Sequence, residues 1–188
     1  MNIYQRGCWL LGVGLIACTS MNVGCASRHA NMWKTVHEGV AVVRPTTGST
    51  CHGVVRFQDT GEGLRIVADI EGLDPNSTHA FHVHQYGDAT APDGTSAGGH
   101  YNPEGMPHGR PTDVKRHAGD LGNLVADAAG NAHYEIVDND LTVAGLINPV
   151  IGRAVIIHRD KDKFVQPTGA AGPRIGIGII GIANPKKQ

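Results

Sequence analysis

The chain of 188 residues is 40% hydrophobic and contains 26 glycines but few aromatic residues, which suits a single domain of about 160 residues built from short strands and turns rather than from long helices. Its formal net charge is −1 and it carries no basic block, which argues against a partner that is a nucleic acid. Beyond the N-terminal segment, no apolar run is long enough to span a membrane.

The N-terminal segment has the pattern of an export signal. A single charge, Arg6, precedes an apolar run over residues 9–17, which is too short for a transmembrane helix and about as long as the core of a signal peptide. The sequence Leu15-Ile16-Ala17-Cys18 resembles a bacterial lipobox, in which the chain is cut before Cys18 and its thiol receives a lipid. An ordinary signal peptide cut near Ala26 and a cytosolic chain are the alternatives.

We therefore expect a signal peptide over residues 1–17, a flexible tether over 18–34 and one folded domain over 35–188. The protein is then exported to the periplasm or cell envelope and anchored to a membrane by its lipid. Of the remaining cysteines, Cys25 and Cys51 either form a disulfide or leave Cys51 as a small buried apolar side chain.

Eight segments of the predicted domain have the features of β-strands. In the clearest one, Leu64, Ile66, Ala68 and Ile70 alternate with mostly polar residues, as in an antiparallel strand with one buried face. The other expected strands cover about 36–43, 54–57, 79–86, 121–127, 131–137, 152–158 and 174–183. Their number and spacing predict an all-β sandwich or barrel.

Two stretches interrupt this series of strands. Residues 87–119 and 159–173 contain no convincing strand, and loops of this length are usually functional or disordered. The first of them contains three histidines, His100, His108 and His117, which favours a functional loop.

A first group of histidines suits copper. His82 and His84 are two residues apart on an expected strand, so their side chains share a face about 6.6 Å apart along it, while Phe81 and Val83 face the core. Such a pair is common by chance and is weak evidence alone. His158, at the end of another apolar strand, strengthens it, because a rigid set of imidazole nitrogens favours copper.

A second group suits zinc. His100, His108, His117 and Asp120 offer three imidazoles and one carboxylate, which can close a tetrahedral zinc site. The metal would order a loop that has no strand pairing of its own. The alternative is that these histidines are merely solvated in a polar loop.

Several motifs in the same order resemble the Cu/Zn superoxide dismutase family over about residues 38–183. They are AFHVHQYGD at 80–88, TSAGGHYNP at 95–103, HGRP at 108–111, RHAGDLGN at 116–123, GRA at 152–154 followed by His158, GPR at 172–174 and GIIGIA at 178–183. The resemblance implies an eight-stranded Greek-key β-barrel with two long functional loops.

The resemblance also implies a role for each residue. The copper ligands would be His82, His84, His158 and His100, and the zinc ligands would be His100, His108, His117 and Asp120. His100 would thus bridge the metals, Asp162 would link a copper histidine to a zinc histidine, and Arg174 would line the substrate channel. His100 and Arg174 are the residues expected to act in catalysis.

The implied reaction is the disproportionation of superoxide to oxygen and hydrogen peroxide, with copper and zinc as cofactors. Lys115, Lys161, Lys163, Arg110 and Arg116 either extend a positive funnel for the anion or are plain surface charges. The sequence leaves the oligomeric state open, with a homodimer as one of the states.

Two other kinds of protein fit the same residues. One is a copper/zinc carrier or chaperone-like protein on the same scaffold without turnover, and the other is a structural sandwich with incidental histidines. The presence of Asp162 and Arg174 favours the enzyme, since a carrier needs neither residue.

The chain departs from the family in two places. The positions of the usual family disulfide are occupied by Gly94 and Ile177, and the loop from His158 to Arg174 is shorter than in typical members. We therefore expect the loop at 87–99 to depend more on packing and on zinc.

Overall fold

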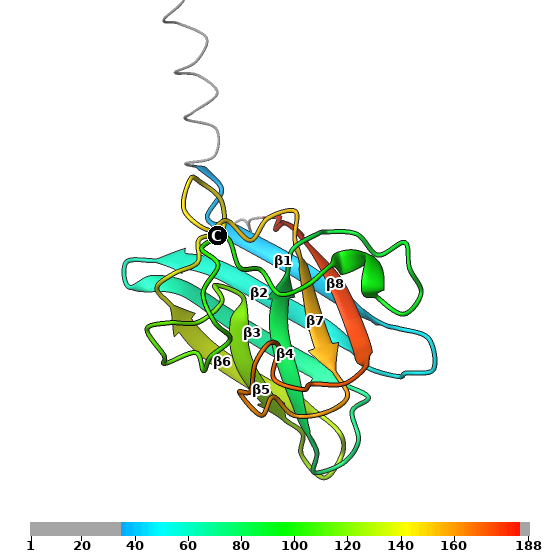
Figure 1. Cartoon of the computed structure of the whole chain (residues 1–188). Coiled ribbons are helices and arrows are strands. Elements are labelled where there is room, and N and C mark those ends of the chain that lie inside the picture. The colour runs from blue at the N-terminus through cyan, green and yellow to red at the C-terminus, as the bar shows by residue number, and fades with distance from the viewer. Residues whose placement is uncertain (1–34, 185–188) are drawn as a thin grey trace, which may run out of the picture.

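The structure is a computed structural model that describes residues 35–184. It contains eight antiparallel strands, as the sequence predicts (Figure 1). The strands are β1 (Glu38–Pro45), β2 (His52–Thr60), β3 (Gly63–Glu71), β4 (Thr78–His84), β5 (Asp120–Val125), β6 (Ala132–Asp138), β7 (Ala154–His158) and β8 (Arg174–Ile182). The expected signal peptide, tether, lipobox and Cys25 lie outside the described residues. Within 35–184, no helix is long and apolar enough to cross a bilayer.

The strands form one strongly twisted sheet that curls into a nearly closed barrel. Their order is β5-β4-β7-β8-β1-β2-β3-β6, so that β8 pairs with β1, and β4 pairs with β7 rather than with β3. These non-consecutive pairings are those of a Greek-key arrangement and confirm the fold expected from the sequence. At the seam, β5 and β6 are the two end strands, and the Tyr134 hydroxyl on β6 donates a 2.5 Å hydrogen bond to the Leu121 carbonyl on β5.

The interior of the barrel is filled by one face of each strand. The alternation predicted on β3 is confirmed, because Leu64, Ile66, Ala68 and Ile70 are all buried in the main core. Cys51 is also buried in this core and forms no disulfide within residues 35–184, and burial raises the pKa of its thiol to about 12. It therefore acts as a small apolar side chain.

Two strands, β4 and β7, are buried on both faces. Phe81 and Val83 pack in the core, while His82 and His84 point to the outer face and are nevertheless buried. Long loops cover them: the segment between β4 and β5, which contains the short 3-10 helix η2 (Thr95–Ala97), and the segment between β7 and β8 (orange in Figure 1). The loops thus enclose a polar compartment against the outside of the barrel.

Candidate metal centre

The compartment contains all seven predicted ligands, and every one of them is buried. On one side, β4 supplies His82 and His84, the end of β7 supplies His158, and an isolated β-bridge to His84 brings in His100. One ligand-capable atom from each of these four residues lies within 4.8 Å of the others. The Nε2 atoms of His84 and His158 are 3.4 Å apart.

The other side gathers His100, His108, His117 and Asp120. The Nδ1 atoms of His100 and His117 are 3.3 Å apart, and they lie 3.0 and 3.2 Å from Asp120 Oδ1. His108 Nδ1 lies 2.9 Å from Asp120 Oδ2. A tetrahedral ion with bonds of about 2.0–2.1 Å holds its ligand atoms about 3.3 Å apart. The spacing of these donor atoms therefore suits zinc, and His100 belongs to both groups.

Two unpaired nitrogens provide an independent test of whether the residues fit metals. His82 Nδ1 and His108 Nδ1 are buried, and no well-directed hydrogen bond from the described residues satisfies either atom, although His108 Nδ1 lies 2.9 Å from Asp120 Oδ2. Their opposite nitrogens, both Nε2, lie 2.9 Å from the two carboxylate oxygens of Asp162. Buried polar atoms are rarely left unpaired, and a metal-binding histidine commonly donates its other N–H to a carboxylate. Both observations fit histidines whose Nδ1 atoms serve as ligands.

The remaining copper-side histidines are oriented in the same manner by backbone carbonyls. His84 Nδ1 donates to Gly98 O over 2.9 Å, and His158 Nδ1 donates to Gly172 O over 3.0 Å. Each ring therefore carries its proton on Nδ1 and directs the lone pair of Nε2 into the compartment.

Burial keeps the copper-side rings neutral. It lowers the pKa of His82 to about 3 and that of His158 to about 4, and it holds the pKa of His84 well below its usual value. Neutral imidazole is the form that binds a metal. At neutral pH these rings can therefore bind a metal without first losing a proton.

The zinc side pairs carboxylates with histidines. Burial opposes the charged forms of Asp120 and Asp162, but the surrounding histidines outweigh it and hold the pKa of each carboxyl well below its usual value. Burial likewise opposes the charged form of His108, but the neighbouring Asp120 and Asp162 raise its pKa to about 9. Negative charge is therefore concentrated where a divalent cation would lie.

Arg174 lies one carbonyl away from the copper-side histidines. Its guanidinium donates to the carbonyls of Gly94 and Gly98, and the latter also accepts the bond from His84. It lines a pocket of about 290 Å³ together with Thr47, Asp93, Thr95, Gly172 and Pro173. A half-buried cation beside an open pocket is suited to a small anion.

Arg116, which the sequence suggested as part of a positive funnel or as a surface charge, lies in the interior instead. Arg116 is buried, and its guanidinium contacts Asp138 at 2.6 Å and Asp140 at 2.9 Å. It also donates to the His117 carbonyl over 3.0 Å. Arg116 therefore fixes the backbone beside a zinc-side histidine, a role that sequence reasoning missed because its main partner is 22 residues away.

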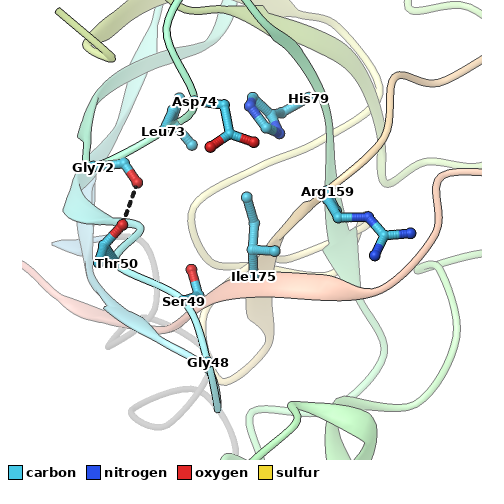
Figure 2. A pocket seen from close by; sticks show the side chains of 9 residues that line it. All are labelled: Gly48, Ser49, Thr50, Gly72, Leu73, Asp74, His79, Arg159 and Ile175. Atoms are coloured by element: carbon cyan, nitrogen blue, oxygen red, sulfur yellow. Dashed lines mark hydrogen bonds between the residues drawn. The ribbon is translucent and has the colours of Figure 1, made fainter.

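A second pocket, of about 180 Å³, lies apart from the metal centre (Figure 2). His79 and Arg159 line it together with Ser49, Thr50 and Asp74. None of the seven predicted ligands lines this pocket. The pocket is connected to the predicted ligands through one hydrogen bond, which His79 Nδ1 donates to the backbone carbonyl of His158 over 2.9 Å.

Comparisons with known proteins agree with this chemistry. The family model of copper/zinc superoxide dismutase (SODC) matches residues 51–180. The chain is 45% identical over 139 residues to a superoxide dismutase [Cu-Zn] of Paramecium bursaria Chlorella virus 1, covering 70% of this chain and 73% of that protein. It is 39% identical over 173 residues to an extracellular superoxide dismutase [Cu-Zn] of Brugia pahangi, covering 82% and 84%.

A solved structure is similar as well. The crystal structure described as that of the clock protein EA4 superimposes with a TM-score of 0.72 at 36% sequence identity. The match covers 79% of this chain and 96% of that one.

Proposed function

The chain belongs to the copper/zinc superoxide dismutase family, and from this premise we propose how its own residues divide the work. The enzyme is a superoxide dismutase, and copper and zinc are its metals. His82, His84 and His158 hold copper, His108, His117 and Asp120 hold zinc, and His100 bridges the two. The pair of buried Nδ1 atoms of His82 and His108 that no hydrogen bond satisfies supports metal binding most strongly, and the two groups of ligand atoms that share His100 support the division.

Copper bound there supplies the one-electron chemistry that converts two superoxide anions and two protons into oxygen and hydrogen peroxide. The residues of the chain deliver the anion and the protons. His100 directs Nδ1 toward Asp120 and His117, which leaves Nε2 as the nitrogen on the copper side. This Nε2 atom can accept a proton and pass it to reduced superoxide, because the zinc-side contacts hold the ring in place.

Arg174 attracts and orients superoxide. Its two backbone bonds fix the guanidinium at the edge of the pocket next to the copper-side histidines. The fixed positive charge raises the local concentration of a small anion without requiring a positive net charge on the chain.

A carrier or chaperone-like protein that binds both metals without turnover is the alternative. Metal analysis of the purified protein, combined with a superoxide-consumption assay before and after chelation, separates the two functions. We expect one copper and one zinc per chain, loss of activity on chelation, and recovery only when copper is returned. Full metal content without consumption of superoxide would establish the carrier.

The bridge itself is tested by His100→Ala. This substitution removes the only residue common to both groups of ligands, so copper and zinc should bind independently and the copper spectrum should no longer respond to zinc. An unaltered copper spectrum together with unaltered activity in this variant would contradict the bridge.

We also propose that a signal peptide over 1–17 exports the enzyme, that a tether over 18–34 carries a lipid on Cys18, and that 35–188 is the folded domain. The extracellular relative of Brugia pahangi supports export. Mass spectrometry of the N-terminus of the purified protein tests the anchor, because cleavage before Cys18 with a diacylglycerol adduct is expected. Cleavage near Ala26, without lipid, would contradict it.

A homodimer is our proposal for the oligomeric state. The outer face of β1 and β8 presents Val40, Val42 and Ile179 around one pocket, in which Val42 is 56% and Ile179 38% exposed. Burial of such a face between two copies would remove apolar surface from water. Light scattering should give twice the chain mass, and Val42→Glu should halve it; a monomeric wild-type protein would contradict the dimer.

A further inference from the structure

The short segment between β7 and β8 folds closely around His108. Phe164 places its ring nearly parallel to that of His108, with centroids 6.4 Å apart, and its backbone N–H donates to Asp162 Oδ1 over 2.7 Å. Lys163 N–H donates to Gly169 O, and Gly169 N–H donates to Val165 O. The segment therefore forms a closed turn, and Gln166 lies within it.

Only glycine fits where this turn closes. The Gly169 backbone has a φ of +75°, and a Cβ atom there would lie 2.0 Å from Asp162 Oδ1 and 2.9 Å from His108 Nε2. The turn thus lies directly against the carboxylate and the ring that it surrounds.

Gln166 pairs with the backbone of His108 through both ends of its amide. Its Oε1 accepts from the His108 N–H over 2.9 Å, and its Nε2 donates to the His108 carbonyl over 2.7 Å. His108 is only 4% exposed, and within residues 35–184 no other hydrogen bond reaches these two backbone groups. Because unpaired buried backbone groups are costly, Gln166 determines where this part of the backbone can lie.

A second amide does the same for Asp162. Asn123 on β5 accepts from the Asp162 N–H over 2.7 Å and donates to the Asp162 carbonyl over 3.2 Å. Asp162 then holds the His108 ring through its carboxylate, while Gln166 holds the His108 backbone. His108 is therefore fixed at both its ring and its main chain, and both restraints come from the same segment.

We propose that Gln166 is a positioning residue for His108, which keeps the Nδ1 atom of this ring at the distance from Asp120 that zinc requires. This inference rests on the zinc site proposed above. It assigns to a surface side chain, 58 residues away along the chain, a share of zinc affinity rather than of general stability. The absence of cysteines at Gly94 and Ile177 makes such a restraint more important, because no disulfide limits the movement of the neighbouring loop.

The test uses Gln166→Met in the full chain. Methionine has nearly the same length and volume but offers neither amide bond. Thr168→Val is the matched control, because Thr168 is exposed in the same segment and makes no hydrogen bond among those found in residues 35–184. Gln166→Asn keeps the amide but is one methylene too short to reach both groups.

We expect Gln166→Met and Gln166→Asn to weaken zinc binding about tenfold in competition with a chelator, which is the lower end of the effect of residues that orient metal ligands. Cobalt(II), substituted for zinc, should show a changed visible spectrum in both variants. The Tm of the metal-free protein should fall little, and Thr168→Val should match the wild type in every measurement.

The experiment distinguishes a failure of the proposed zinc site from a failure of the role proposed for Gln166. If the wild-type protein binds cobalt without a tetrahedral spectrum, the proposed zinc site itself is wrong, and the role of Gln166 falls with it. If the wild type gives that spectrum but Gln166→Met retains the same zinc affinity and cobalt spectrum, only the role of Gln166 is overturned. A loss of Tm with unchanged affinity would likewise show that Gln166 is merely structural.

Discussion

Asp162 contacts one histidine from each half of the proposed metal centre through its two carboxylate oxygens. Oδ2 lies 2.9 Å from His82 Nε2 on the copper side, and Oδ1 lies 2.9 Å from His108 Nε2 on the zinc side. Because each oxygen accepts a hydrogen bond from the Nε2–H group of one ring, the carboxylate orients both rings so that Nδ1 faces the site where a metal would bind.

Replacement of Asp162 by Asn tests whether both of these hydrogen bonds are needed. The amide has one acceptor oxygen and one NH2 group, so it can satisfy only one of the two rings. We expect the affinity for copper or for zinc to fall about 10–100-fold, as measured by competition with chelators. Asp160→Asn, at a partly exposed carboxylate two residues away, is the control; equal affinities in the two variants would contradict the role of Asp162.

Arg174 is a separate case, because its guanidinium donates to two loop carbonyls and lines the pocket proposed for superoxide, and within residues 35–184 its only pairing with a predicted ligand is the backbone register with His158. Arg174→Ala should lower the rate of superoxide consumption about tenfold or more at low ionic strength and should leave both metals bound. The dependence of the rate on salt should also weaken, since screening acts on the removed charge.

Arg174→Lys separates charge from geometry. Lysine keeps the charge but cannot donate to Gly94 and Gly98 with a planar fork, so its rate should lie between those of the wild type and Arg174→Ala. Turnover in Arg174→Ala equal to that of the wild type across ionic strengths would remove this residue from the mechanism.

The loop at 87–99 shows how an element is held without the usual disulfide. A small apolar cluster joins it to the barrel: Ala97 from the loop, Ala154 and Ile156 from β7, and Ile177 from β8. The bonds from Arg174 to the loop carbonyls add a second connection to β8. Packing and hydrogen bonds thus occupy the positions at which the family has a covalent link.

Such connections are reversible, so we expect the loop to be more mobile when the metals are removed. Limited proteolysis of the metal-free protein should cut within 87–119 several times faster than that of the loaded protein, because the zinc ligands no longer fix the far end of the loop. Cleavage sites located by mass spectrometry provide the check. Equal protease resistance of the two forms would contradict this dependence on zinc.

The strands were predictable from local patterns, and the clustering of the candidate ligands was predictable from motifs that resemble the family. The expected strand at 79–86 ends at His84, since Gln85 and Tyr86 donate to Gly99 and Ala97 of the loop rather than to a neighbouring strand. The strand expected from residue 152 begins at Ala154 as β7, because Gly152 lies in a turn with a φ of +81°.

The residues that orient the ligands were not predictable in this way. Arg116 and Gln166 have side chains that are ordinary at a surface, and nothing adjacent to them in the sequence marks a partner. Their roles follow from contacts with Asp138 and His108, which are 22 and 58 residues away. Such pairs arise only after the loops fold over the outer face of β4.

On the scale of the whole molecule, the barrel and the metal centre are linked at one seam. Tyr134 joins β6 to β5 by its bond to Leu121, and it packs edge-on against Phe81 in β4, with centroids 5.9 Å apart. Arg116 joins the zinc-side loop to Asp138 at the end of β6. The loop that contains His117 is therefore also bonded to the end strand β6 through Arg116. Metal binding to this loop should for that reason be coupled to the global stability of the barrel.

The shifted pKa values of the histidines predict a maximum in the free energy of unfolding of the metal-free protein near pH 6.5. The pKa values of His82 and His158 fall from the ordinary 6.5 to about 3 and about 4, so between these values and 6.5 the unfolded chain binds more protons. Stability is then lost as the pH falls below 6.5. The lowered pKa values of Asp120 and Asp162 add to the loss below their usual range.

His108 acts in the opposite direction. Its pKa is raised to about 9, so its stabilising contribution is complete below pH 6.5 and is lost as the pH rises through 9. For the metal-free protein, the free energy of unfolding measured with urea across pH 4 to 9 should therefore fall on both sides of pH 6.5, as an acid limb and an alkaline limb. In the zinc-loaded protein His108 Nδ1 carries no proton, so the part of the decline that lies between pH 6.5 and 9 should vanish; the buried Cys51 thiol, whose pKa is raised to about 12, acts only above pH 9 and in both forms. His133→Gln, which alters an exposed histidine, should retain both limbs; a rise in stability of the metal-free wild type between pH 6.5 and 9 would contradict the ion pairing of His108.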